Sequence, residues 1–191
     1  MLRTLHRTSE PNPEVFGLEQ VKIFLKEDLS HNDELAEELA ISSREWLEDE
    51  TGMNFGVSGY KLFLSKFIDI VIPRYPLQDG SVVVTYTDDQ GADQTMDSSS
   101  YTVIDEEIPA RLKFTGDLPS LKEDKEYPVW ITFNAGYTPA KTPKRAITVL
   151  KLMVTHYFNH RDLSDKRVNY DTPIPYRVRH LTNQLKARRL L

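Results

Sequence analysis

Two histidines, His156 and His160, are four residues apart in a segment with helical periodicity. On a helix their imidazoles would share one face, at a spacing that can bind a metal ion. The zinc-protease form of this pattern also needs a glutamate directly after the first histidine, and Tyr157 occupies that position. The sequence offers no identifiable third ligand. We therefore predict no metal site and interpret the pair as interface or capping residues near a helix C-terminus.

Carboxylates and serines also cluster, but in contexts that do not favour catalysis. Asp105-Glu106-Glu107 and Glu123-Asp124-Lys125-Glu126 lie in turns flanked by proline or lysine, which is typical of solvated loops and not of an acid/base pair. Ser98-Ser99-Ser100 lacks a glycine elbow and a nearby histidine. The chain has no cysteine and no glycine-rich phosphate loop. We predict no catalytic residue and no cofactor, and therefore a protein that is not an enzyme.

Charge is distributed unevenly along the 191 residues, whose formal net charge is -5. Residues 1–140 hold 12 basic and 26 acidic residues, a net charge of -14, whereas residues 141–191 hold 12 basic and 3 acidic residues, a net charge of +9. A basic C-terminal segment indicates an anionic partner, or the acidic body of a neighbouring copy. Its candidate docking residues are Arg177, Arg179, Lys186, Arg188 and Arg189.

Nucleic acid is an alternative partner for this basic segment. Its cations surround the predicted helix and do not form one stripe, and Tyr170 and Tyr176 are the only aromatic residues near them. This pattern does not favour sequence-specific binding. Non-specific contact with DNA phosphate stays open beside docking on an acidic protein surface.

The positions of apolar residues predict where the helices and strands lie. Helical spacing predicts helices over 18–26, over 31–51 (with Arg44 and Glu48 on its polar side) and over 175–189. Between them, residues 60–133 are rich in β-branched and aromatic residues separated by turn signals, which indicates antiparallel hairpins. No apolar run is long enough for a membrane span or a secretory signal, so we expect no membrane contact and a protein that stays where it is made.

The segment from Thr142 to Asn159 predicts a helix that is apolar on most of its circumference. Its polar residues follow one narrow stripe, so the helix needs burial on more than one side. We expect its own domain to cover one side and a neighbouring subunit another. The candidate interface residues are Leu150, Met153, Tyr157 and Phe158.

Together these elements predict an α+β fold, a small bundle of about four helices with an antiparallel β-hairpin insertion between the second and third helices. We expect a flexible N-terminal lead-in over 1–16 and the first two helices within 17–56. The β-rich insertion is expected over 57–137, and the last two helices with the basic segment over 138–191.

The order of these features resembles the head–tail connector (adaptor) proteins of tailed bacteriophages, in the variety that carries a β insertion. The similarity extends from Leu18 to Leu185, and Ile41-Ser42-Ser43 departs from it by replacing an alanine-rich turn. Besides the helix pattern, the segments that carry it are Pro76-Leu77 before a valine-rich strand, the turn from Asp88 to Gly91, Tyr101 in the next strand, and Ala135-Gly136-Tyr137 before a proline-capped helix that ends in Tyr157, His160 and Arg161.

The resemblance implies a structural protein of the virion, at the head–tail junction, that is present in the host cytoplasm during assembly. Such connectors form a ring, commonly of twelve subunits, beneath the portal protein. The ring extends the DNA channel and offers a platform to the next neck or tail-completion protein. By the same resemblance, the C-terminal segment would dock on the portal. The alternative function is a nucleic-acid-binding module of the DNA packaging machinery that uses this basic tail.

Overall fold

The computed structural model describes residues 3–25, 33–159 and 174–186, which divide into two compact units. The β unit comprises the described residues up to Asn12 together with Gly56–Tyr137. The helical unit comprises the described parts of Pro13–Phe55 and of the chain from Thr138 onward. The predicted α+β class is confirmed, and all strand pairings among the described residues are antiparallel. No described helix is both long and apolar enough to cross a bilayer.

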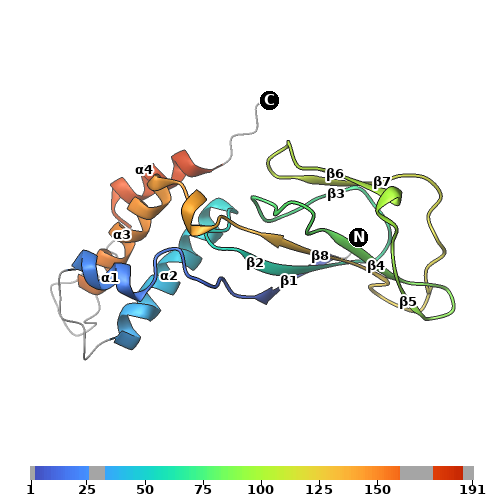
Figure 1. Ribbon diagram of the computed structural model, residues 1–191, viewed down its shortest axis with the longest axis horizontal. Helices are drawn as coiled ribbons and strands as arrows, with labels where there is room; N and C mark the ends of the chain where they lie inside the picture. Colours follow the sequence, from blue (N-terminus) through green and yellow to red (C-terminus); the bar gives the residue numbers. More distant parts are fainter. Residues whose placement is uncertain (1–2, 26–32, 160–173, 187–191) are drawn as a thin grey trace. The chain divides into compact units, whose positions relative to one another are not determined.

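Two antiparallel sheets form the β unit (Figure 1). The five-stranded sheet has the order β1-β2-β8-β4-β5, and the three-stranded sheet has the order β3-β7-β6. The strands are β1 (Arg3–Ser9), β2 (Ser58–Leu64), β3 (Ile70–Val71), β4 (Val83–Thr87), β5 (Asp93–Thr95), β6 (Tyr101–Ile104), β7 (Arg111–Phe114) and β8 (Val129–Ala135), with a short 3-10 turn at Ser98–Ser100.

The core of the β unit is built from side chains that alternate along the strands. In β2 every second residue from Tyr60 to Leu64 is buried, and in β8 the same holds from Val129 to Ala135. Leu112 of the smaller sheet belongs to the same apolar cluster. Because successive strand residues point to opposite faces, Lys61, Phe63 and Trp130 lie on the other face of the larger sheet.

The expected flexible lead-in over 1–16 is wrong for its first part, because Arg3–Ser9 forms an edge strand paired with β2. Leu5 packs against the core cluster while Thr4 and His6 are exposed, an alternation too short to stand out in the sequence. Val15 and Phe16, also within 1–16, are buried in the helical unit. In chain order β2 to β8 do follow the second helix and precede the third, but β1 precedes both helices, so the sheet is assembled from two separate stretches.

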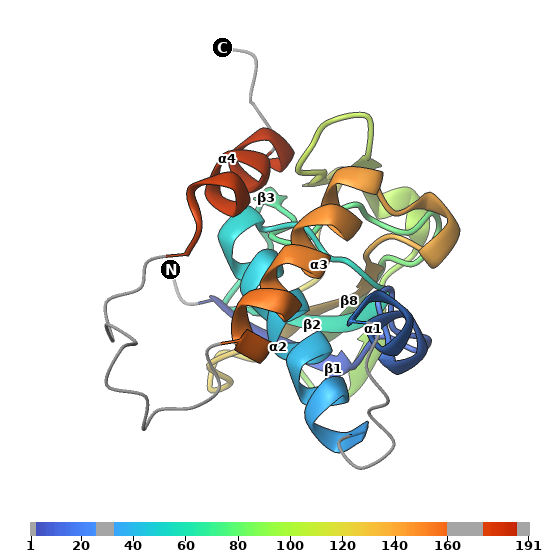
Figure 2. The same ribbon diagram turned by 90° about the vertical axis from the view of Figure 1, so that its left-hand side faces the viewer.

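The helical unit contains α1 (Leu18–Leu25), α2 (Asp33–Thr51), α3 (Lys144–Asn159) and α4 (Tyr176–Leu185). A short 3-10 turn, Pro139–Lys141, precedes α3. Helix α3 contacts all three of the other helices (Figure 2). Most of its apolar circumference is therefore covered within the unit, whereas Ile147 is only partly buried.

A buried ion-pair cluster centred on Arg44 joins three segments of the helical unit. The Arg44 guanidinium donates to Glu48 at 2.9 Å and to Glu14 at 3.0 Å, and both Arg44 and Glu48 are fully buried. The second carboxylate oxygen of Glu48 accepts from the backbone N–H of Phe55 at 2.8 Å. The expectation that Arg44 and Glu48 lie on the polar side of the helix is wrong: their charges satisfy each other inside, which makes burial tolerable.

The beginning and the end of the Gly56–Tyr137 stretch approach each other closely at Gly136. This residue has φ +131°, and a Cβ placed on it would overlap the carbonyl oxygen of Gly56. Its backbone N–H donates to the carbonyl of Pro76 at 2.8 Å, and its carbonyl accepts from the Gln78 side chain at 2.6 Å. Only glycine fits here, because φ is positive and any Cβ would overlap the Gly56 backbone while the hydrogen bonds of Gly136 hold it in place.

We predict that Gly136→Ala lowers the free energy of unfolding by about 3 kcal/mol or more, from backbone strain and overlap combined. Urea unfolding followed by Trp130 fluorescence in a Trp46→Phe background would measure it in the β unit. Gly80→Ala is the matched control, because Gly80 also has positive φ (+64°) but has no atom near an added Cβ. Gly80→Ala should lower the free energy of unfolding by about 1 kcal/mol. Equal losses of unfolding free energy in the two variants would contradict the close approach of Gly136 to Gly56.

For the Arg44 cluster we predict that Glu48→Leu destabilises the helical unit by about 3–5 kcal/mol, because it removes a charge partner and the acceptor for Phe55. Glu48→Gln keeps an acceptor for the Phe55 N–H and leaves Arg44 paired with Glu14, so its cost should be clearly smaller. Urea unfolding followed by Trp46 fluorescence in a Trp130→Phe background distinguishes them. Identical midpoints for the two variants would show that the cluster does not bind the segment after α2.

Candidate functional site

The structure describes only one of the two histidines, His156. His156 lies on α3, partly buried, with its ring centre 6.0 Å from that of Tyr157. His160 lies outside the described residues. Across residues 3–25, 33–159 and 174–186, no three histidine or acidic side chains are grouped as a metal site requires.

The acidic and serine clusters lie in exposed turns. Asp105–Glu107 occupies the turn between β6 and β7, where Glu107 pairs with Arg111 at 2.9 Å. Ser98–Ser100 forms a turn capped by Asp97, whose carboxylate accepts from the Ser99 N–H at 2.8 Å. This hydrogen bond lowers the pKa of Asp97. These contacts stabilise turns and bring no nucleophile to a base.

Asp88 and Asp93 play similar local roles in the β4–β5 hairpin. The pKa of Asp88 is lowered chiefly by the hydrogen bond from the Gln94 side chain, and that of Asp93 by the hydrogen bond from Thr87. Lys125 completes this arrangement, because its ammonium donates to the Thr87 hydroxyl at 2.6 Å and lies 3.5 Å from Asp93. The acidic residues of this hairpin are thus structural in their described contacts.

The predicted interface residues of α3 divide into two pairs. Leu150 and Met153 are fully buried in the core of the helical unit. They are therefore unavailable to a neighbouring copy in this conformation, and their assignment as interface residues is corrected: the partners that cover them are the other helices of the chain. Tyr157 and Phe158 are half-buried, and burial raises the pKa of the Tyr157 hydroxyl.

The structure describes three of the five candidate docking residues of the basic segment. Arg177 and Arg179 are exposed on α4, whereas Lys186 pairs with Glu50 of α2 at 3.2 Å. Arg188 and Arg189 lie outside the described residues. Helix α4 is held to the unit by Val178 and Thr182, both buried, so its opposite side faces solvent.

The solvent side of α4 also carries an aromatic group. Tyr176 is 82% exposed and stacks on the His180 ring with centres 6.0 Å apart, and Gln184 lies 2.7 Å from the same imidazole. Beside Arg177 and Arg179, this stripe can contact a protein surface through a flat aromatic ring and guanidinium groups.

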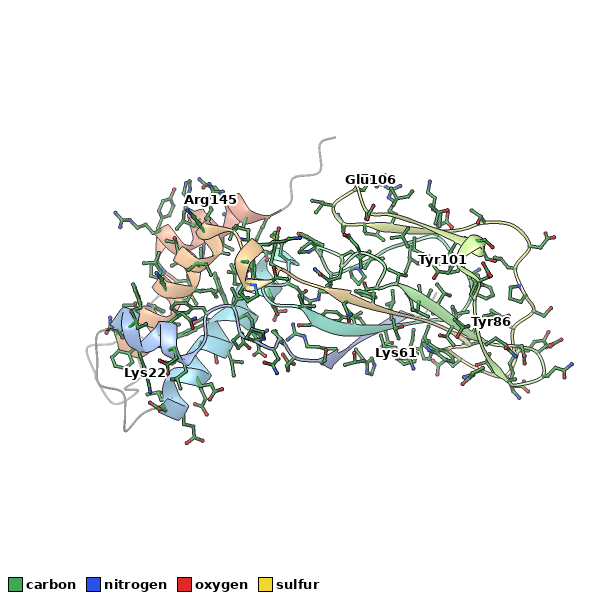
Figure 3. The ribbon with its side chains drawn as sticks, viewed as in Figure 1. Lys22, Lys61, Tyr86, Tyr101, Glu106 and Arg145 are labelled. Carbon is green, nitrogen blue, oxygen red and sulfur yellow. The ribbon has the colours of Figure 1, made fainter. Side chains whose placement is uncertain are left out.

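A second surface, which the sequence did not predict, lies on the outer face of the larger sheet. The ammonium groups of Lys61 and Lys125 lie 4.6 and 5.0 Å from the ring centre of Trp130. Figure 3 shows Lys61 on the side of this sheet that faces away from the smaller one. With Phe63 and Tyr127 these residues line a hollow of about 390 Å³. Cation–π contacts already engage both lysines, so the surface is amphipathic more than it is cationic.

A third surface is an apolar groove between α1 and α3, of about 420 Å³, which we call the α1–α3 groove. Ile23 at its edge is 76% exposed and Phe24 is 38% exposed. Helical spacing in 18–26 predicted Phe24 on the apolar face of α1, but of this face only Val21 is fully buried. The signal that could have revealed the groove is Ile23, an apolar residue off the predicted stripe.

Comparison with solved structures shows the fold of the whole chain in three assemblies. A chain in the neck of an empty gene transfer agent (GTA) particle, computed with C6 symmetry, matches with a TM-score of 0.79 at 16% identity, over 98% of this chain and 97% of that one. A chain in the virion of a native GTA particle matches with a TM-score of 0.77 at 16% identity. A chain in the neck of a native GTA particle, computed with C12 symmetry, matches with a TM-score of 0.73 at 17% identity. Both matches cover 98% of this chain and 97% of the other. At these identities the likeness shows a shared fold.

No protein-family model and no curated protein matches this sequence.

Proposed function

We propose that this chain is a structural neck component of a tailed-phage-like particle, acting as a head–tail adaptor at the head–tail junction of the virion. The observation that carries the proposal is the match of the complete fold, over 98% of this chain, to chains in the necks of GTA particles. A match of both units together, including the strand that precedes the helices, is more specific than a match of one common domain. The order of sequence motifs that resembles connector proteins supports the same conclusion.

Within this proposal twelve copies of the chain form a ring beneath the portal protein. The side of the ring that faces away from the portal binds the next neck or tail-completion protein. The necks with similar chains were computed with C6 and C12 symmetry, which supports a ring. A head-to-tail ring needs two different complementary surfaces on each subunit. The acidic first 140 residues and the basic last 51 provide opposite charges for such contacts.

We further propose that α4 docks on the portal through its solvent side. Arg177 and Arg179 are both exposed and flank the solvent side of α4 on its two edges, while Val178 and Thr182 hold the helix to the unit, so this surface can bind without unfolding. Lys186 contributes less, because it is paired with Glu50. The rival function, a nucleic-acid-binding module of the packaging machinery, would use the same two arginines on DNA phosphate.

Mixing the full-length chain with portal rings of the same particle separates these functions. An adaptor comigrates with the portal in size-exclusion chromatography, and light scattering gives the mass of a ring added to the portal. A packaging module instead leaves the portal unchanged and shifts double-stranded DNA at moderate salt. Failure to join the portal or any other neck protein would overturn the adaptor proposal.

For the docking surface, we predict that Arg177→Glu/Arg179→Glu weakens portal attachment about tenfold at low salt. The loss should shrink at high salt, because ions screen exposed charges beyond a Debye length of about 3 Å at 1 M. Sedimentation with portal rings at both salt concentrations would measure it. The matched control is Lys66→Glu/Lys113→Glu, which reverses two exposed cations of the β unit. An equal loss in the control, or a salt-independent one, would contradict docking through α4.

A further inference from the structure

The α1–α3 groove joins an apolar floor to a basic edge. Its apolar lining comes from Val15, Phe16, Ile23, Phe24 and Ile147. Lys151 lines it too, with its ammonium 5.3 Å from the ring centre of Phe24. A surface of this kind favours an apolar side chain that is accompanied by negative charge.

Helix α3 extends this basic edge. Lys144 lies seven residues before Lys151 on the same helix face, with Ile147 between them, and α3 contains no acidic residue. Lys144 and Arg145 stand in the first turn, where the helix dipole disfavours cations. Arg145 contacts the carbonyl oxygen of Gln184 at 3.5 Å, whereas the Lys144 side chain is exposed. A positive helix end with this placement attracts carboxylates more strongly than scattered lysines would.

The β6–β7 turn of the β unit has the opposite character. It presents Asp105, Glu106 and Glu107 followed by Ile108, whose side chain is 58% exposed. Glu106 lies at the bend of this hairpin (Figure 3). The Glu107–Arg111 pair braces the turn at 2.9 Å. The turn therefore presents an exposed apolar side chain directly after three carboxylates, on a scaffold of two paired strands.

We propose that the β6–β7 turn of one copy inserts Ile108 into the α1–α3 groove of the next copy, with Asp105 and Glu106 facing Lys144 and Lys151. This inference rests on the proposed ring and assigns its subunit contact. The two surfaces differ, so the contact is head-to-tail, the type that closes into rings. Burial of Ile108 in the apolar groove supplies affinity. The opposite charges set the orientation of the turn and exclude a contact in the reverse orientation.

Cross-linking can test this pairing directly, because the chain has no native cysteine. Single variants Ile23→Cys and Ile108→Cys, both at exposed positions, are mixed, assembled alone or on portal rings, and treated with a short bismaleimide. A covalent dimer that forms only in the mixture is expected. Leu118→Cys replaces Ile108→Cys in the matched control, because Leu118 is a 40% exposed apolar residue in another turn of the β unit.

A charge exchange tests orientation. Glu106→Lys and Lys151→Glu should each raise the concentration needed for assembly about tenfold, and the double variant should recover most of the loss. Rings that form without the Ile23–Ile108 cross-link would overturn this contact while leaving the adaptor proposal intact. The same holds if the double variant loses as much assembly free energy as the two single variants lose together. Dimers with Leu118→Cys instead would assign the groove to a different turn. A chain that never assembles, with or without portal, would overturn both proposals.

Discussion

The helical unit depends on the buried contact of Arg44 with Glu48 and Glu14. The charges of Arg44 and Glu48 lie where water cannot solvate them, so each is tolerable only while its partners stay in place. The contact therefore fixes the segment before α1 to α2, and through the Phe55 N–H it also fixes the segment that follows α2. The position of the α1–α3 groove follows from it, since Val15 and Phe16 lie beside Glu14.

A helix with an apolar circumference does not by itself indicate an intermolecular interface. Helix α3 packs against α1, α2 and α4, and two of the four residues predicted to contact another subunit, Leu150 and Met153, are buried in the core of its own unit. Three exposed surfaces remain for a partner: the solvent side of α4, the outer face of the larger sheet and the α1–α3 groove, to which α3 contributes only Ile147 and Lys151. Each combines apolar or aromatic area with charged side chains, the composition that protein interfaces favour over a purely apolar patch.

The low identity to the GTA chains has a physical explanation. At 16–17% identity few side chains are shared, yet the fold spans 98% of this chain. Many different sequences can satisfy the requirements of this fold. These requirements are alternating burial in β2 and β8, a helix covered on several sides, and a glycine where two backbones meet. Surface charges are not constrained in this way. Two proteins can therefore share this fold while the contacts made by their surfaces differ.

The sequence by itself determined the local elements and the broad class. Helical spacing placed α2 and α3 within two residues of their observed starts, and the β-branched and aromatic content of residues 60–133 indicated the antiparallel hairpins found between these two helices. It also placed the acidic turns in solvent, because clustered carboxylates cannot be buried without partners. These features depend on neighbours close in the chain.

Only the tertiary structure decided which charges are inside and which apolar residues are outside. Arg44 and Glu48 read as surface residues until Glu14, thirty positions away, is placed beside them. The strand at Arg3–Ser9 needs the edge of β2, and Ile23 becomes the edge of a groove only when α3 packs beside α1. Each of these outcomes depends on residues far apart in the chain, and periodicity within one segment carries no information about them.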